Sequence, residues 1–190
     1  MSHELRTPLT TALGYAQLLV GKVEDKQLRQ VALRIFYETQ RATDTVRNLL
    51  AFVEQPRPDK HPENLNDILT KALERKAYDL RSSNIEVEAN LSPDLPTILI
   101  DAPQFHQVFL HVLNNACQAM VDYGTTRKLC IQTSQYGQNL RVEIADTGPG
   151  ISPELLPFIF EPFRQSLNSS AQRQGGVGLG LYIVQQLLTL

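Results

Sequence analysis

Three side chains that can accept or move a proton stand together at the start of the chain, in the stretch Ser2-His3-Glu4-Leu5-Arg6-Thr7-Pro8-Leu9. On a helix, at about 100° per residue, His3 and Thr7 lie one turn apart on a face opposite the leucines. A neutral imidazole is a competent nucleophile near pH 7, and a neighbouring carboxylate such as Glu4 can fix its tautomer and orientation. The stretch is therefore a candidate for nucleophilic chemistry, although most solvent-facing histidines have no chemical role.

A second polar group lies on a predicted helix over residues 103–121. His111 and Asn115 are four residues apart and share one helical face, opposite much of the apolar stripe. An asparagine carbonyl is a hard oxygen ligand that suits Mg²⁺, whose other ligands are then waters and phosphates. Taken alone, the asparagine is more simply a solvated helix residue.

Glycine-rich turns follow. Asp146 enters the turn Asp146-Thr147-Gly148-Pro149-Gly150 at the end of a predicted strand, where its carboxylate can accept a hydrogen bond from an exocyclic amine such as N6 of adenine. Gly175-Gly176-Val177-Gly178-Leu179-Gly180 opens an apolar helix, whose N-terminus favours phosphate oxygens. Either turn alone is weak evidence, because the first could be only a tight turn and glycine clusters are common.

Apolar periodicity predicts two long helices, over residues 2–23 and 27–53, joined by the turn Glu24-Asp25-Lys26. Each helix carries one apolar stripe, and a lone hairpin cannot bury both. We therefore expect a four-helix bundle made from two copies, the alternative being that the stripes pack on the rest of the chain. Pro8 either bends the first helix just after His3 or lies in a first turn that tolerates proline.

A linker is predicted where the prolines gather, between Glu54 and Pro62. We divide the chain into a hairpin domain over residues 1–54, a linker over 55–62 and a second domain over 63–190. Helices and a mostly antiparallel sheet alternate in the second domain, so the fold class is α+β, a helical hairpin followed by an α/β sandwich. The expected helices are 65–80 and 103–121, and the expected strands are 85–91, 97–100, 128–135 and 140–145.

Composition restricts the function. The chain has 190 residues, 42% of them hydrophobic, and a net charge of −2, which gives no electrostatic reason to expect nucleic acid or an anionic membrane as partner. No apolar run approaches the ~20 residues that span a bilayer, so we expect a cytoplasmic core. Cys117 and Cys130 form no close-spaced motif and are expected to be small core residues in a reducing compartment.

The motifs together, in this order, resemble the H, N, G1, F and G2 boxes of sensor histidine kinases, the F-box being Phe158-Ile159-Phe160-Glu161-Pro162-Phe163. The resemblance covers nearly the whole chain. It implies a dimerisation and phosphotransfer hairpin, then a Bergerat-type ATP-binding domain of the gyrase–Hsp90–histidine kinase–MutL superfamily, with a lid over residues 151–175. It also implies that the chain is a core truncated at both ends, with its ATP-binding domain incomplete at the C-terminus and the sensor domain missing.

The same resemblance assigns roles. His3 is implied to be the phospho-acceptor, Glu4 its base or orienting partner, and Thr7 the residue that helps a water attack the phospho-aspartate of a response regulator. Asn115 is implied to hold Mg²⁺ and Asp146 to read adenine. The glycines implied to shape the pocket and lid are Gly148, Gly150, Gly176, Gly178 and Gly180.

Departures from the family pattern matter too. His111 stands where most sensor kinases have asparagine and hydrolysing members have a glutamate base, an arrangement that resembles chemotaxis-type kinases. A direct role near the phosphates and a supporting role both stay open. Gln118 and Ala119 replace a lysine and a tyrosine common in the family. Either Arg164 or Arg173 could be the lid cation, with Arg164 preferred.

The predicted function is thus a protein-histidine kinase. It would transfer the γ-phosphoryl group of Mg-ATP to His3 and then to an aspartate of a response regulator, as a homodimer. One rival is an ATP-hydrolysing machine, which is disfavoured because His111 replaces the glutamate and an H-box is present. The other is a catalytically inactive dimerising scaffold, which the presence of His3, Asn115 and Asp146 disfavours and the expected truncation favours.

Overall fold

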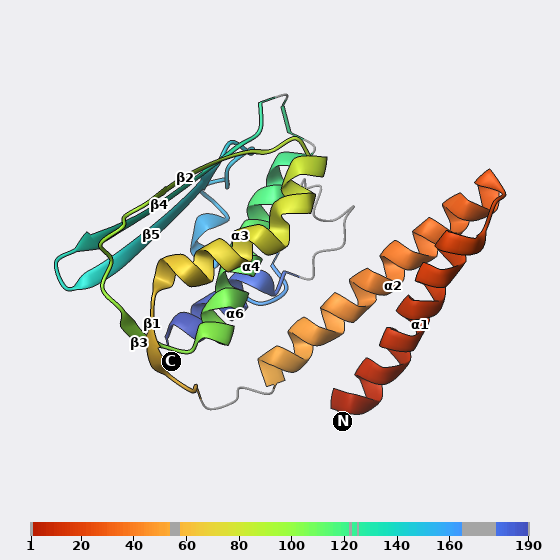
Figure 1. The fold of residues 1–190 in the computed structure, drawn as a ribbon, viewed down its shortest axis with the longest axis horizontal. Coiled ribbons are helices and arrows are strands. Elements are labelled where there is room, and N and C mark those ends of the chain that lie inside the picture. Colours follow the sequence, from red (N-terminus) through yellow and green to blue (C-terminus); the bar gives the residue numbers. More distant parts are fainter. Residues whose placement is uncertain (1, 54–57, 122, 125, 165–177, 190) are drawn as a thin grey trace. The chain divides into compact units, whose positions relative to one another are not determined.

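The computed structural model describes residues 2–53, 58–121, 123–124, 126–164 and 178–189, without the side chains of residues 2–6, 44 and 47–53. The chain divides into two compact units, Met1–Gln55 and Pro56–Leu190 (Figure 1). Residues 55–57 of the predicted linker and residues 165–175 of the predicted lid lie outside the described residues. No helix within the described ranges has both the length and the apolarity needed to cross a membrane.

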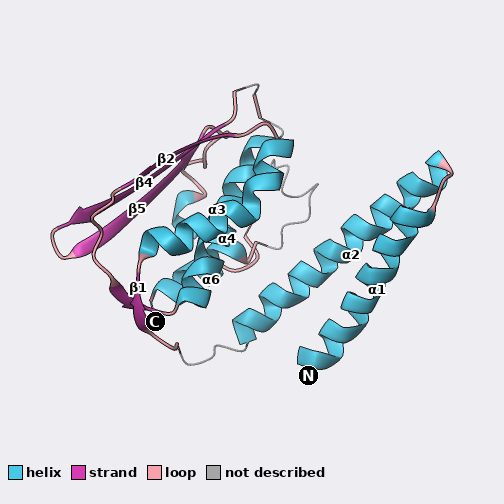
Figure 2. Cartoon of the chain, in the orientation of Figure 1, coloured by secondary structure: helices cyan, strands magenta, loops and turns pink. Residues whose placement is uncertain are grey.

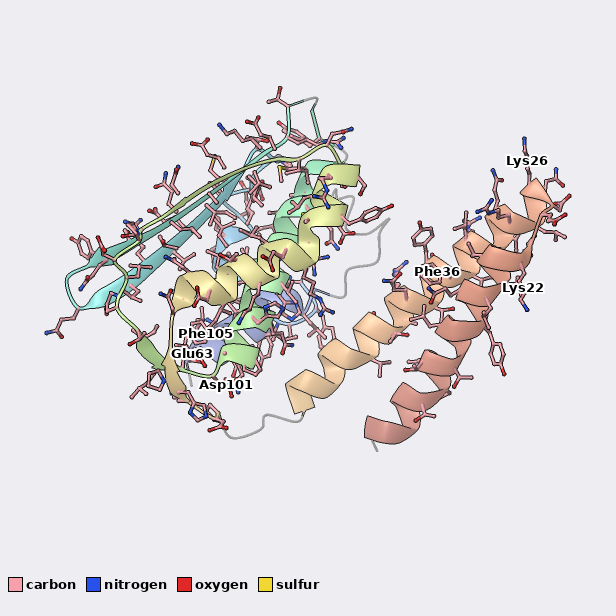
Figure 3. All side chains as sticks on the ribbon, viewed as in Figure 1. Lys22, Lys26, Phe36, Glu63, Asp101 and Phe105 are labelled. Atoms are coloured by element: carbon pink, nitrogen blue, oxygen red, sulfur yellow. The ribbon has the colours of Figure 1, made fainter. Side chains whose placement is uncertain are left out.

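The first unit is a helical hairpin of α1 (Ser2–Lys22) and α2 (Lys26–Val53). The predicted turn lies between them, flanked by Lys22 and Lys26 (Figure 3). Asp25 starts α2 by accepting the N–H of Leu28 at 2.8 Å on its Oδ1, which satisfies one of the free donors of the first helical turn. Pro8 lies inside α1, past the first turn, so it removes the hydrogen bond to the Glu4 carbonyl.

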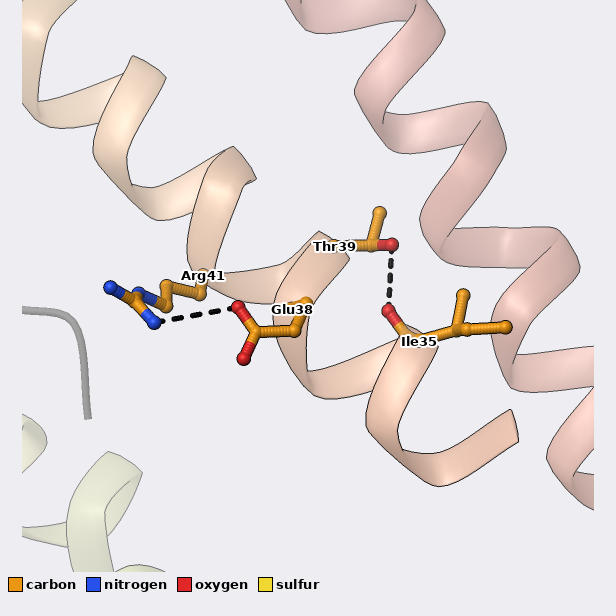
Figure 4. A network of polar contacts seen from close by, with 4 residues as sticks. All are labelled: Ile35, Glu38, Thr39 and Arg41. Atoms are coloured by element: carbon orange, nitrogen blue, oxygen red, sulfur yellow. Dashed lines mark hydrogen bonds and ion pairs between the residues drawn. The ribbon is translucent and has the colours of Figure 1, made fainter. Parts of the chain in front are cut away.

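Small residues form the contact between α1 and α2. Ala16 and Ala32 are 5% and 0% exposed, and Thr43 is buried with its hydroxyl donating to the Thr39 carbonyl at 2.8 Å. Thr39 makes the same kind of bond to Ile35, 2.7 Å long, whereas Arg41 pairs with Glu38 on the exposed side of α2 (Figure 4). Several larger apolar residues of the hairpin stay exposed, among them Leu18, Leu19, Leu28, Val31 and Ile35. The hairpin thus leaves apolar residues of its predicted stripes uncovered.

The second unit is an α/β sandwich, which agrees with the α+β class predicted from the sequence (Figure 2). A three-stranded sheet has the order β2 (Glu86–Leu91), β4 (Lys128–Tyr136) and β5 (Asn139–Asp146). β2 pairs with β4 in parallel, and β4 pairs with β5 in antiparallel register. The helices α3 (Leu65–Ser82) and α4 (Ala102–Val121) cover one face, and α6 (Gly180–Leu188) packs on α4 (Figure 1). A 3₁₀ turn spans Leu156–Phe158.

One end of the predicted linker is wrong. His61 and Pro62 belong to β1 (His61–Glu63), which pairs antiparallel with β3 (Ile98–Ile100) in a separate two-stranded sheet. Proline is tolerated in this sheet because two-stranded sheets consist of edge strands. Asp101 secures the same corner: its Oδ2 accepts the N–H of Asp59 and its Oδ1 that of Gln104, each at 2.9 Å, at the start of α4 (Figure 3).

The core lies between the sheet and helices α3 and α4. Its fully buried side chains include Leu69, Leu113, Met120, Leu129 and Ile131. On β4, the alternation of buried and exposed residues follows the two-residue period of a strand with one face covered. The helix that carries His111 and Asn115 is therefore held by its apolar face against the sheet.

A buried hydroxyl links three segments of this core. Thr133 is 5% exposed; its Oγ1 accepts the N–H of Ser92 at 2.9 Å and donates to Oδ1 of Asn66 at 2.9 Å. Asn66 in turn donates to the Ser92 carbonyl at 2.8 Å. Every partner in this small network is satisfied, as buried polar groups require.

Candidate functional site

Two of the predicted motifs meet where α6 begins. A Cβ atom built on Gly180 would lie 3.6 Å from Oδ1 of Asn115 and 3.6 Å from Nδ1 of His111. The first residue of α6 therefore packs directly against the polar face of α4. Because a helix N-terminus favours negative charge, this contact brings an amide oxygen and an imidazole to a position suited to phosphates.

The imidazole of His111 has a defined hydrogen-bonding arrangement. Nε2 of Gln107 lies 3.4 Å from Nε2 of His111, one turn earlier on α4. An amide nitrogen can only donate, so His111 Nε2 is the acceptor and, in the neutral ring, Nδ1 carries the hydrogen. Burial lowers the pKa of His111, which favours the neutral form. The Nδ1–H group then faces the start of α6.

The turn after β5 is built around Asp146, the last residue of that strand. Oδ1 of Asp146 accepts the N–H of Gly148 at 2.8 Å, so one carboxylate oxygen is held by its own turn. A Cβ atom at Gly148 would lie 2.7 Å from that oxygen and 3.0 Å from Cβ of Ala119 on α4. Glycine is required here because the turn and α4 approach too closely for a side chain. Asp146 thus lies beside the helix that carries Asn115.

The F-box and the second glycine turn are joined directly. The N–H of Phe163 donates to the carbonyl of Gly178 at 3.0 Å, and both residues adopt positive φ angles, 65° and 71°. Arg164 turns back on its own segment: its Nε lies 2.8 Å from Oε2 of Glu161 and its guanidinium carbon 5.2 Å from the centroid of the Phe158 ring. The middle of the predicted lid, at the end of the F-box, therefore contacts the glycine turn that follows the lid.

The structure places five of the predicted site residues in two groups of contacts at α4: Gly180 against His111 and Asn115, and Gly148 with Asp146 against Ala119. Gly178 lies against Arg164, and Gly150 has a φ of 71° with open space around it. Gly176 and Arg173 lie outside the described residues.

In the first unit, the backbone of His3 and Glu4 is helical and Thr7 is exposed one turn later. The side chains of His3 and Glu4 are among those not described. Exposure of Thr7 agrees with the predicted solvent-facing side of α1.

Sequence reasoning missed Gln107 and Thr147. Gln107 precedes His111 by four residues on the same helix, which is a spacing that brings side chains together and was available as a signal. Thr147 lies between Asp146 and Gly148, so its hydroxyl was hidden inside a motif interpreted only through its carboxylate and its glycines.

These features define an ATPase-type sandwich preceded by a helical hairpin. Residues 1–57 match the family model described as the His Kinase A (phospho-acceptor) domain, and residues 100–190 match the model of histidine kinase-, DNA gyrase B- and HSP90-like ATPases. The chain belongs to the histidine kinase family.

Individual relatives and a solved structure agree with this family. The chain is 36% identical over 199 residues to the sensory histidine kinase/phosphatase NtrB of Vibrio alginolyticus, an alignment covering 99% of this chain and 54% of the relative. It is 32% identical to NtrB of Rhodobacter capsulatus, with coverage of 100% and 54%. The crystal structure of full-length ShkA in complex with AMPPNP superposes with a TM-score of 0.75 at 28% identity, covering 99% of this chain and 39% of ShkA. The chain spans about half the length of the curated relatives it matches.

Proposed function

We propose that this chain is the catalytic core of a sensor histidine kinase. Residues 1–54 form the dimerisation and phosphotransfer hairpin, residues 55–60 the linker, and residues 61–190, which begin with β1, the ATP-binding domain. The core transfers the γ-phosphoryl group of ATP to His3 and then to an aspartate of a response regulator. Because ATP is the donor, we place this chemistry in the cytoplasm.

The observation that carries the proposal is the convergence of α4 and α6. Gly180 meets Asn115 and His111, and the Asp146 turn lies against Ala119 one turn further along the same helix. Together these residues provide a phosphate position and an amine acceptor about one helical turn apart along α4. This arrangement suits a nucleotide lying along the helix, and the complex of the relative ShkA with AMPPNP, an ATP analogue, supports it.

Phosphoryl transfer needs a nucleophile, a leaving group and charge neutralisation. A ring nitrogen of His3 attacks the γ-phosphorus, the bond from that phosphorus to the bridging oxygen breaks, and ADP leaves. Glu4 orients the imidazole and accepts its other proton in a hydrogen bond. Little covalent chemistry is asked of the protein, so positioning and electrostatic stabilisation supply most of the rate.

The residues around Asn115 fit a magnesium ion. The Asn115 amide oxygen faces the start of α6, at a position where glycine leaves the space of a side chain open. Mg²⁺ commonly takes one or two protein ligands and completes its shell with water and phosphate oxygens, neutralising phosphate charge when bound. Asn115 would hold the ion, and the Nδ1–H group of His111 would donate to a phosphate oxygen or to a bound water.

Arg164 is the lid cation of this proposal. Its guanidinium is half exposed and is held by Glu161 and Phe158, next to the Gly178 contact. Arginine matches phosphate geometry well, and an exposed pair with Glu161 is weak enough to exchange for a phosphate. The glycines at 148, 150, 176, 178 and 180 shape the pocket and lid around the nucleotide.

The uncovered apolar face of the hairpin supports a homodimer. Leu28, Val31 and Ile35 recur at helical spacing on α2 and are 61%, 55% and 49% exposed. A second copy of the hairpin would bury this face in a four-helix bundle. Leu28→Glu together with Ile35→Glu should convert the dimer to a monomer in sedimentation experiments, whereas Arg41→Glu on the exposed side should not.

A response regulator is the proposed second substrate. Thr7 lies on an exposed turn of α1 after His3, where a docked receiver domain could be reached. The relatives named sensory histidine kinase/phosphatase support a kinase activity and a phosphatase activity for this core.

The decisive experiment is incubation with γ-labelled ATP, followed by an acid-lability test of the retained label. His3→Gln should abolish labelling while nucleotide binding survives. His61→Gln is the matched control, because His61 is an exposed histidine in β1 and should not alter labelling. Acid-stable label, or acid-labile label persisting on the His3→Gln chain, would contradict the proposed function.

A further inference from the structure

Thr147 ends the pairing of β4 with β5 in an unusual way. The ladder runs as far as Leu129 opposite Asp146. At the next pair, the N–H of Thr147 donates to the Lys128 carbonyl at 3.2 Å, as a backbone ladder requires. The N–H of Lys128, however, donates to Oγ1 of Thr147 at 2.9 Å. The hydroxyl therefore takes the place of the Thr147 carbonyl, and the backbone is released to turn.

The same hydroxyl has a second bond. Oγ1 of Thr147 donates to the carbonyl of Thr126 at 3.1 Å and lies 3.6 Å from Sδ of Met120, on the last turn of α4. One side chain thus ties the end of β5 to the segment between α4 and β4. Its bonds join the strand that carries Asp146 to the helix that carries Asn115.

The release of the backbone decides how Asp146 is held. With the carbonyl of Thr147 out of the ladder, the chain turns so that the N–H of Gly148 reaches Oδ1 of Asp146 at 2.8 Å. If Lys128 instead bonded the carbonyl of Thr147, the strand would continue by one residue. Gly148 would then move away from Asp146 and from Ala119, and the carboxylate would lose its fixed orientation.

We propose that Thr147 is a positioning residue that sets the preference of the site for adenine by holding the Asp146 carboxylate in the turn. The inference rests on the proposed function, because Asp146 must be the group that accepts the 6-amino hydrogen bond. Thr147 itself does not touch the nucleotide. Its contribution is transmitted through the turn to the oxygen of Asp146 that meets the amine.

The test compares ATP with purine riboside triphosphate, which lacks the 6-amino group. The ratio of their dissociation constants, measured by calorimetry on the 190-residue chain, isolates the hydrogen bond to Asp146. Thr147→Val keeps the shape of the side chain and removes the hydroxyl, and Thr147→Ser restores it. Thr126→Val is the matched control, because it keeps the backbone carbonyl that accepts from Thr147.

We expect Thr147→Val to reduce the preference for ATP about fivefold, which corresponds to about 1 kcal/mol, the net value of one hydrogen bond. Binding of purine riboside triphosphate should stay unchanged, since it does not use Asp146. Thr147→Ser and Thr126→Val should keep the preference of the original chain. In an Asp146→Asn background, Thr147→Val should have no further effect on the ratio.

The possible outcomes distinguish a failure of the inference about Thr147 from a failure of the proposed function. If the preference for ATP over purine riboside triphosphate disappears in Asp146→Asn but persists in Thr147→Val, the inference about Thr147 is overturned. The proposed function then still stands. Equal weakening of both nucleotides by Thr147→Val also overturns the inference, because it indicates general loss of structure. An original chain that does not distinguish the nucleotides, or an Asp146→Asn chain that still does, overturns the adenine-reading role and the inference together.

Discussion

Gly178→Ala should damage the junction between the F-box and the second glycine turn. Gly178 has a φ of 71°, and a Cβ there would lie 2.5 Å from the carbonyl oxygen of Arg164 and 2.9 Å from its nitrogen. These are backbone atoms, so no rotamer change relieves the overlap. Gly137, in the β4–β5 hairpin, has a φ of 62° with nothing within 4 Å of its Cβ position. The two glycines share the backbone conformation and differ in crowding.

The expected magnitudes follow from this comparison. A left-handed alanine costs roughly 1–2 kcal/mol at either position. At Gly178 the segment Phe163–Arg164 must also move by roughly 1 Å to reach ordinary van der Waals contact. That movement breaks the 3.0 Å bond from the N–H of Phe163 to the Gly178 carbonyl, a further loss of about 1 kcal/mol. We expect Gly178→Ala to cost about 2–3 kcal/mol.

Urea unfolding of the two variants, followed by circular dichroism, measures the difference, and calorimetry with ATP measures its consequence for the site. Gly178→Ala should lose more stability than Gly137→Ala and should bind ATP more weakly. Gly137→Ala should bind ATP as the original chain does. Equal losses of stability, with ATP affinity unchanged in both variants, would refute the argument that the F-box and the glycine turn depend on this contact.

Three other expectations concern separate parts of the chain. Thr7→Ala should preserve autophosphorylation and reduce dephosphorylation of the regulator, because Thr7 lies a turn from His3 and is not needed for imidazole attack. A parallel fall of both activities in radiolabel assays would instead indicate that Thr7 is a structural residue. Burial raises the pKa of the Cys117 thiol, an effect that Lys76 partly opposes. Since the thiolate is the reactive form, the rate of alkylation of Cys117 by iodoacetamide should rise only at a higher pH than for an unfolded peptide thiol. If mass spectrometry shows that the pH of half-maximal alkylation rate is equal to or lower than that of the peptide thiol, the expectation is wrong. Thr133→Val should destabilise the second unit by about 1–3 kcal/mol, because the part-buried N–H of Ser92 loses its acceptor, and Thr133→Ser should recover most of the loss in thermal melts.

The local hydrophobic pattern of the sequence was enough to predict most helices and strands. The helices α1, α2, α3 and α4 begin and end within about two residues of their predicted bounds, since a one-sided apolar stripe is a local property. The boxes were also visible in the sequence, because each depends on residues that are close together in the chain. For the same reason, the histidine kinase family could be inferred from the order of the motifs.

The pairing of strands from distant segments could be identified only from the tertiary structure. β1 forms inside the predicted linker only because Ile98–Ile100 offers it a partner, and the proline-rich composition of the linker contains no sign of that strand. The parallel pairing of β2 with β4 likewise depends on the path of α4 between them. Such contacts join residues separated by tens of positions, which periodicity does not encode.

By itself, therefore, the sequence determined the helices, the order of the motifs and the residue types that could do chemistry. Only the tertiary structure decided which atoms meet: Gly180 against His111 and Asn115, and the Thr147 hydroxyl in place of a ladder carbonyl. The physical reason is that a motif limits the chemistry available to a side chain, whereas its orientation follows from packing and hydrogen bonds made by residues far away in the chain.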